Sequence, residues 1–185
     1  MQFHRLASFI IGIWLGVSVF MDFVATQNFR TVGRVLGSMD VREVETAKKV
    51  GDVEAARLLL RYFAGEANRY LFEQWEWAEL MIGLALLIAL VFGRTYQKFA
   101  IVLCLLMICL VFAQRFAITP TIVKLGRELD FSNSASRRFS AYHAIYGYVE
   151  LAKLGLGVLL IGRLLIRTGA SKRAFVRQYE RPREA

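Results

Sequence analysis

Proline is almost absent from this sequence, which contains only Pro120 and Pro182 in 185 residues. Because proline interrupts helices, nearly the whole chain is free to form long ones. Cysteine is equally scarce. Cys104 and Cys109 stand five residues apart within one apolar stretch, on different faces of a helix. This spacing excludes a disulfide framework and a cysteine metal pair.

Recognisable catalytic and ligand-binding motifs are also missing. The sequence has no glycine-rich phosphate loop and no serine or threonine in a nucleophile elbow. Paired metal-ligand spacings such as His-x-x-x-His or Glu-x-x-His do not occur. We therefore expect no enzymatic activity, and the sequence indicates no particular cofactor.

The net charge of +9 raises the question of nucleic-acid binding. The charged residues are concentrated in segments 30–69 and 163–183. Acids nearly balance the first segment, and the second follows directly on an apolar stretch, where membrane proteins carry cytoplasmic bases. No basic-aromatic recognition motif is present, so we expect no nucleic-acid partner.

What the sequence has in abundance is apolar side chains, at 56% of residues, against roughly 45–50% in soluble domains. They gather in four windows, 6–25, 75–93, 98–118 and 139–166, each able to supply the ~20 residues that span a bilayer. Asp22 is unlike the end of a cleaved signal peptide, so the first window is interpreted as a retained helix. The sequence predicts an all-α, integral membrane, four-helix transmembrane bundle, a single domain over residues 1–185 with the lipid bilayer as its solvent.

Segment 26–74 is predicted to be an external loop with amphipathic helices of its own. Asp40 and Asp52 each precede a helical pattern and are suitable N-caps. The second of these helices is expected to run into the second crossing, with a break at Gly65. Trp75 and Trp77 would mark the membrane interface.

Basic residues predict the orientation. The connection between the second and third crossings holds Arg94 and Lys98 and no acid, and the tail 167–185 is rich in arginine and lysine. With four crossings both lie on one side of the membrane, which the positive-inside bias makes the cytoplasm. Both termini are therefore expected to be cytoplasmic.

Three short motifs carry a resemblance to a known family. They are His4-Arg5-Leu6 followed by Trp14-Leu15-Gly16 and Phe20, then Arg115-Phe116-Ala117-Ile118-Thr119-Pro120-Thr121-Ile122, and then Phe139-Ser140-Ala141-Tyr142-His143. Together they are similar to bacterial four-helix membrane proteins called domain of unknown function 4149, related to eukaryotic transmembrane protein 205. The charged segment 42–61 departs from the family pattern. The resemblance implies four crossings and a place in the bacterial inner (cytoplasmic) membrane, and it implies no reaction.

Several ionisable residues fall within or beside the apolar windows, where they are costly unless used or paired. Topology brings them to similar depths as a polar cluster in an outward-facing funnel. One interpretation is a cation or metal site in which Glu76, Glu79 and His143 are ligands. Others are ion pairs, Arg115 with Glu76 or Glu79 and Lys153 with Glu150 or Asp22, or side chains that snorkel to the headgroups. The predicted cluster is Asp22, Glu76, Glu79, Arg115, His143, Glu150 and Lys153.

His143 is also a candidate axial ligand for a haem or pigment, since one histidine is enough for one axial bond. Small residues at helical spacing predict close helix packing, within the bundle or against a partner subunit. These are Gly12, Gly16, Ser140, Ala144 and Gly147, with Gly155 and Gly157 further along.

For function, the sequence favours a non-enzymatic accessory or scaffold subunit of a larger membrane complex, with membrane-protein partner subunits. One alternative is a small transporter or ion-handling protein that uses the carboxylate and histidine cluster. Another is a pigment- or haem-binding subunit of a photosynthetic or respiratory complex.

Overall fold

The computed structural model describes the backbone of residues 2–38, 41–93, 98–130 and 137–179, and side chains within 5–38, 44–46, 48–49, 51–93, 98–128 and 137–166. The regular elements of this part of the chain are all helices, which confirms the all-α prediction. They are α1 (Gln2–Gly37), α2 (Val41–Val50), α3 (Val53–Val91), α4 (Lys98–Ala113), η1 (Gln114–Ile118), α5 (Thr119–Asp130) and α6 (Arg137–Tyr179).

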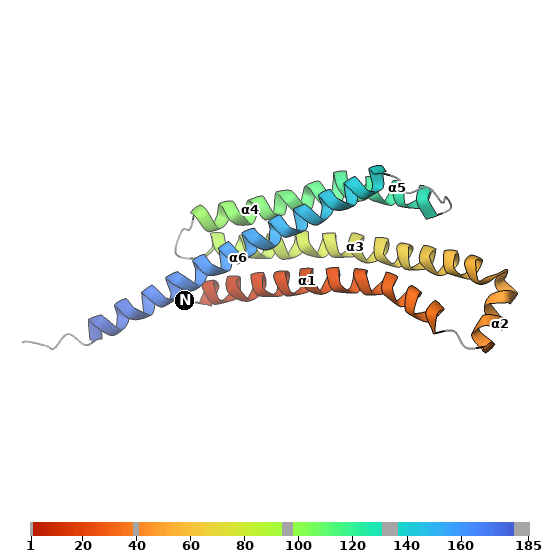
Figure 1. The fold of residues 1–185 in the computed structure, drawn as a ribbon. Coiled ribbons are helices and arrows are strands. Elements are labelled where there is room, and N and C mark those ends of the chain that lie inside the picture. The colour runs from red at the N-terminus through yellow and green to blue at the C-terminus, as the bar shows by residue number, and fades with distance from the viewer. Residues whose placement is uncertain (1, 39–40, 94–97, 131–136, 180–185) are drawn as a thin grey trace, which may run out of the picture.

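The long helices lie side by side as an elongated bundle (Figure 1). α1 and α3 run antiparallel, with α2 at the end where they connect. α4, η1 and α5 follow one another as a single rod, and α6 crosses the others obliquely. The beginning of α1, the end of α3, the beginning of α4 and the C-terminal part of α6 lie toward the same end of the bundle. This agrees with an even number of passes through the bundle.

The helices extend well beyond the predicted crossings. α1 has 36 residues and α3 has 39, which at 1.5 Å per residue is ~54 and ~58 Å, more than a bilayer requires. Much of segment 26–74, predicted as a separate loop, is therefore the continuation of these two helices. The expected break at Gly65 is wrong, because α3 runs through it.

The helix start at Asp52 is confirmed. The carboxylate Oδ1 of Asp52 accepts a hydrogen bond of 2.6 Å from the backbone N–H of Ala55. The bond satisfies one of the first-turn N–H groups, which have no partner inside the helix. Asp40, the other predicted cap, lies outside the described residues.

The helical rod that begins with α4 does not end at Ile118, the predicted end of the third crossing. After α4, residues 114–118 form the π-helical turn η1, and α5 continues to Asp130. Pro120 lacks an N–H, and in an α-helix its ring would clash with the carbonyl of Phe116. The wider turn, in which the Thr119 N–H donates to the carbonyl of Gln114, lets the helix pass the proline.

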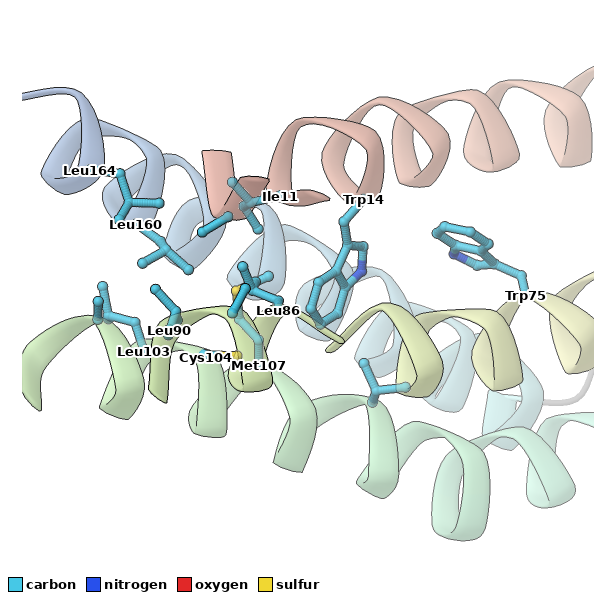
Figure 2. Close-up of a cluster of buried hydrophobic side chains, with 14 residues drawn as sticks. Ile11, Trp14, Trp75, Leu86, Leu90, Leu103, Cys104, Met107, Leu160 and Leu164 are labelled. Atoms are coloured by element: carbon cyan, nitrogen blue, oxygen red, sulfur yellow. The ribbon is translucent and has the colours of Figure 1, made fainter. Parts of the chain in front are cut away.

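The apolar core lies where α1, α3, α4 and α6 meet (Figure 2). Fully buried side chains come from each of them: Ile11 and Trp14 from α1, Leu86 from α3, Met107 from α4, and Leu160 and Leu164 from α6. In lipid such contacts stabilise the bundle through van der Waals packing rather than through removal from water.

The outer surface is also strongly apolar. Phe9, Phe20, Met81, Phe116 and Val158 are each more than half exposed. Soluble monomers rarely expose apolar side chains on this scale. Within the described residues, three helical stretches are long and apolar enough to cross a membrane, Arg5–Gly37, Val53–Val91 and Lys98–Glu128, and α6 is not among them. Only 17% of the apolar window of α1 is buried inside the bundle, so most of that window is uncovered.

The predicted packing glycines differ from the observed ones. Gly12, Gly16 and Gly147 are exposed, and a Cβ atom built on any of them would meet nothing within 4 Å. Ser140 and Ala144 are exposed as well. The close approaches are at Gly157, which was among the predicted residues, and at Gly83, which was not. A Cβ on Gly157 would lie 2.5 Å from Leu15 Cδ2, and one on Gly83 would lie 2.8 Å from Ile108 Cγ1. The prediction of close packing within the bundle thus holds for Gly157, whereas the other small residues face outward because they lie on the uncovered sides of α1 and α6.

Candidate functional site: a buried ionic network

Lys153 of α6 is the centre of a network of charged side chains inside the bundle. Its ammonium donates to Glu79 Oε1 at 2.8 Å and to Glu79 Oε2 at 2.7 Å. It also lies 2.9 Å from Oε1 of Glu150, one turn earlier on the same helix. The exposed fractions of the Lys153 and Glu79 side chains are 3% and 0%. One cation is thus held between two carboxylates away from solvent.

Two uncharged side chains complete the hydrogen bonding of these carboxylates. The indole N–H of Trp14 donates to Glu79 Oε1 at 2.8 Å, and the Gln114 side-chain Nε2 donates to Glu150 Oε1 at 3.0 Å. Trp14 comes from α1 and Gln114 from η1, so the network ties together α1, α3, η1 and α6. Charge-assisted bonds of this kind are roughly twice as strong as neutral ones.

A third buried carboxylate, Glu76, lies one turn before Glu79 on α3. Its Oε1 accepts a hydrogen bond from the Thr119 hydroxyl. Arg115, which the sequence offered as an ion-pair partner for Glu76 or Glu79, has its guanidinium carbon 5.4 Å from the centre of the Trp77 ring. This is within cation–π range.

The π-helical turn explains how Gln114 and Thr119 both reach the interior. In a regular α-helix, residues five apart point ~140° away from each other. The i to i+5 hydrogen bond of η1 instead places them one turn apart on one face. Both side chains are buried, Gln114 completely. Turns of this type are frequent at functional sites.

The structure joins part of the predicted polar cluster. Glu79, Glu150 and Lys153 are bonded together, and the predicted pair of Lys153 with Glu150 is present. Glu76 lies beside them and Arg115 borders them. The predicted funnel is closed at this level, because Glu76 and Glu79 have no exposed surface.

Asp22 and His143 are exposed, and the His143 ring stacks on Phe139 with 5.8 Å between ring centres. Over the described residues, no three His, Cys, Asp or Glu side chains are grouped so that they could hold a metal ion. The glutamates Glu76 and Glu79 are engaged by Thr119 and Lys153 instead. An axial-ligand role for His143 stays a prediction, tested by visible absorbance that His143→Ala removes. The His4 side chain lies outside the described residues.

Three participants of the site were not predicted from the sequence, namely Trp14, Gln114 and Thr119. All three are uncharged, so a search for ionisable residues in apolar stretches passes over them. The available signal was Pro120, since a proline within an apolar helix indicates a local change of helical pitch.

The chain is thus an all-α protein with three helices apolar enough to span a membrane and a buried ionic network between its helices. No protein-family model, no curated protein and no solved structure matches it.

Proposed function

We propose that the chain is an integral membrane protein that crosses the bilayer four times, through α1, α3, the α4–α5 rod and α6. Three of these have the apolar composition for crossing. The fourth, α6, contributes Leu160 and Leu164 to the core of the same bundle. Two charged residues in the middle of α6 have partners inside the bundle. Glu150 accepts a hydrogen bond and Lys153 forms an ion pair. With both termini cytoplasmic, as in a bacterial inner membrane, a cysteine at Lys98 is labelled from the inside and one at Glu54 from the outside. Labelling of both from one side contradicts this topology.

In this topology the network lies near the middle of the bilayer. Trp14 is eight residues beyond Leu6, or ~12 Å into the membrane from its inner side. Lys153 is 13 residues before Ile166, or ~20 Å along the oblique α6 from the same side. The hydrocarbon core is ~30 Å thick. Snorkelling to the headgroups does not account for Lys153, because its ammonium is bonded inside the bundle at this depth.

We infer a non-enzymatic, ion-handling function, in which the network binds or relays a cation. The observation that carries this inference is the Lys153 ammonium held by Glu79 and Glu150 without contact with solvent. Charged residues at this depth are rare in membrane helices, and they mark ion pathways and proton relays. A bundle stabilised by packing alone does not require them, because apolar side chains of similar volume are often as stable.

The test is cation flux in liposomes that contain the purified protein, followed with pH-sensitive and sodium-sensitive dyes. Glu79→Gln preserves the shape of the side chain and an acceptor for Trp14 while it removes the charge. We expect folded Glu79→Gln protein with at least tenfold lower flux, and unchanged flux for Glu128→Gln, whose carboxylate is exposed on α5. Equal flux in the two variants, or no flux in the native protein, refutes the ion-handling function.

A second candidate is the accessory or scaffold subunit, favoured by the small residues that the bundle leaves uncovered. Gly12 and Gly16 on α1, and Ala144 and Gly147 on α6, are exposed, and small exposed residues let another helix approach closely. Gentle purification from the native membrane should then retain a membrane-protein partner that Gly16→Leu releases without unfolding the chain. Purification as a lone chain argues against this role.

A further inference from the structure

Three helical elements meet around Glu76. α3 is joined to the first residue of α5, directly after η1 on the same rod, by the hydrogen bond from Thr119 to Glu76. η1 and α6 are joined by the bond from Gln114 to Glu150 at 3.0 Å. Residues one turn away on α3 and α6 are also in contact with each other. Side chains from all three elements therefore border one small region.

Besides the Lys153–Glu79 ion pair, α6 and α3 make an aromatic contact. The rings of Tyr146 and Phe72 pack edge to face with 5.5 Å between their centres. Tyr146 lies four residues before Glu150 on α6, and Phe72 lies four residues before Glu76 on α3, so each ring is one turn from a glutamate of the site. Tyr146 therefore borders the same region as Glu76 and Gln114.

Each of these elements presents one buried oxygen that lacks a hydrogen-bond partner. They are Glu76 Oε2, Gln114 Oε1 and the Tyr146 hydroxyl, unpaired with respect to the described residues. The exposed fractions of the three side chains are 0%, 0% and 8%. Unsatisfied buried polar atoms are few in native proteins, and each costs about 1–3 kcal/mol. Three at one place indicate a missing ligand rather than three independent defects.

The chemistry of the three atoms is that of acceptors. The carboxylate of Glu150 only accepts, so the amide N–H₂ of Gln114 must face it and the amide carbonyl must face away. Glu76 Oε2 also accepts only, and the Tyr146 hydroxyl has lone pairs of its own. The π-helical turn leaves a further oxygen nearby. The carbonyl of Arg115 has lost its α-helical donor, because the Thr119 N–H bonds to Gln114, and residue 120 is a proline without an N–H.

The charges of the region are unbalanced. With all three glutamates ionised, Glu76 and Glu79 of α3 and Glu150 of α6 carry three negative charges, against two positive charges on Lys153 of α6 and Arg115 of η1. From α1, the exposed Asp22 stands at the margin of the site. In that state the region lacks one positive charge.

Three occupants can be compared. A proton on Glu76 restores the charge and can be shared with one further oxygen, which leaves the third oxygen without a partner. A water molecule serves all three but leaves the charge unbalanced. A small alkali cation does both, because it takes several oxygen ligands at once and carries one charge.

We propose that Glu76, Gln114 and Tyr146 form a buried binding site for one alkali cation, with sodium as the probe. For its physiological purpose the site rests on the ion-handling function proposed above, although binding does not require transport. Glu76 supplies the charged ligand, Gln114 and Tyr146 supply neutral oxygens, and Lys153 keeps the other two carboxylates occupied.

The test is retention of ²²Na⁺ by the purified protein in detergent, in a choline chloride buffer at fixed pH. We expect saturable binding of about one ion per chain. Glu76→Gln should abolish it, and Tyr146→Phe, which deletes only the hydroxyl oxygen, should weaken it about tenfold or more. Glu128→Gln, the matched change at an exposed carboxylate, should bind like the native protein. Circular dichroism and gel filtration establish that each variant is folded, and Tyr146→Phe preserves the test if Glu76→Gln does not fold.

Absence of saturable ²²Na⁺ retention, or retention that neither Glu76→Gln nor Tyr146→Phe changes, overturns the site. Uptake of a proton without retention of ²²Na⁺ overturns it as well. Flux in liposomes separates this proposal from the previous one. Sodium binding without flux leaves the site standing and removes the transport function, whereas flux of a cation that survives Glu76→Gln leaves the function standing and removes the site.

Discussion

Replacing Lys153 by methionine should be among the most destabilising single changes in this protein. The substitution preserves an unbranched, apolar stem of similar length and deletes the ammonium that lies 2.7–2.9 Å from two carboxylates. Removing one partner of a buried ion pair typically costs 3–5 kcal/mol, because the other charge remains buried without compensation. Here two carboxylates lose their cation, and we expect a loss of at least ~3 kcal/mol in the free energy of unfolding.

The measurement is reversible unfolding in mixed micelles, with increasing sodium dodecyl sulfate and helicity followed by circular dichroism. The control is Lys124→Met, the same substitution at an exposed position of α5, which should change the unfolding free energy by less than ~0.5 kcal/mol. The double variant Glu79→Gln with Lys153→Met should lose less than the sum of the two single changes, by ~1–3 kcal/mol. If Lys153→Met and Lys124→Met are equally stable, or if the double-variant cycle shows no coupling, the network does not hold Lys153 as described.

Three further changes test other contacts by the same unfolding measurement. Gly157→Ala places a methyl group against Leu15 and should cost ~1–3 kcal/mol, whereas Gly147→Ala meets open space and should be neutral or stabilising by up to ~1 kcal/mol; the reverse order contradicts the packing. Trp14→Phe leaves the Glu79 carboxylate without its indole donor and should cost ~1–3 kcal/mol, which a Glu79→Gln background reduces. Asp52→Ala removes the cap of α3 and should cost ~1 kcal/mol, with faster amide hydrogen exchange confined to the first turn of that helix; unchanged exchange there refutes the cap.

The charged half of the site was predictable from composition and hydropathy. Glu79, Glu150 and Lys153 interrupt apolar windows, and the cost of an isolated charge in hydrocarbon requires that such residues find one another. Arg115 was offered as a partner for Glu76 or Glu79, whereas Glu79 pairs with Lys153 and Arg115 lies over the Trp77 ring, because depth along a helix indicates only which residues share a level. Which of these residues face one another depends on the rotation of each helix about its axis. That rotation is determined by how the helices pack.

The rotation of the helices also accounts for the other differences between the predicted and the observed site. His143 lies on an outward face, and Asp22 is exposed at the margin of the site, although both stand at suitable heights. Gln114 and Thr119 turn inward together only because the helix changes pitch ahead of Pro120. A regular helical wheel of residues 98–119 separates the two side chains, so no periodicity analysis at 3.6 residues per turn brings them to one site. The cap at Asp52 was predictable because it depends on four consecutive residues alone.

The charges on α6 have a consequence for how the protein is made. Lys153 and Glu150 are unfavourable for release of this helix into lipid on its own, since a central lysine alone weighs ~2.5–3.5 kcal/mol against insertion by the translocon. The partner of Lys153 on another helix, Glu79, belongs to a segment synthesised earlier. In the four-crossing topology, membrane integration of α6 therefore depends on the helices synthesised before it. Insertion of α6 and its packing against α3 then occur as one event.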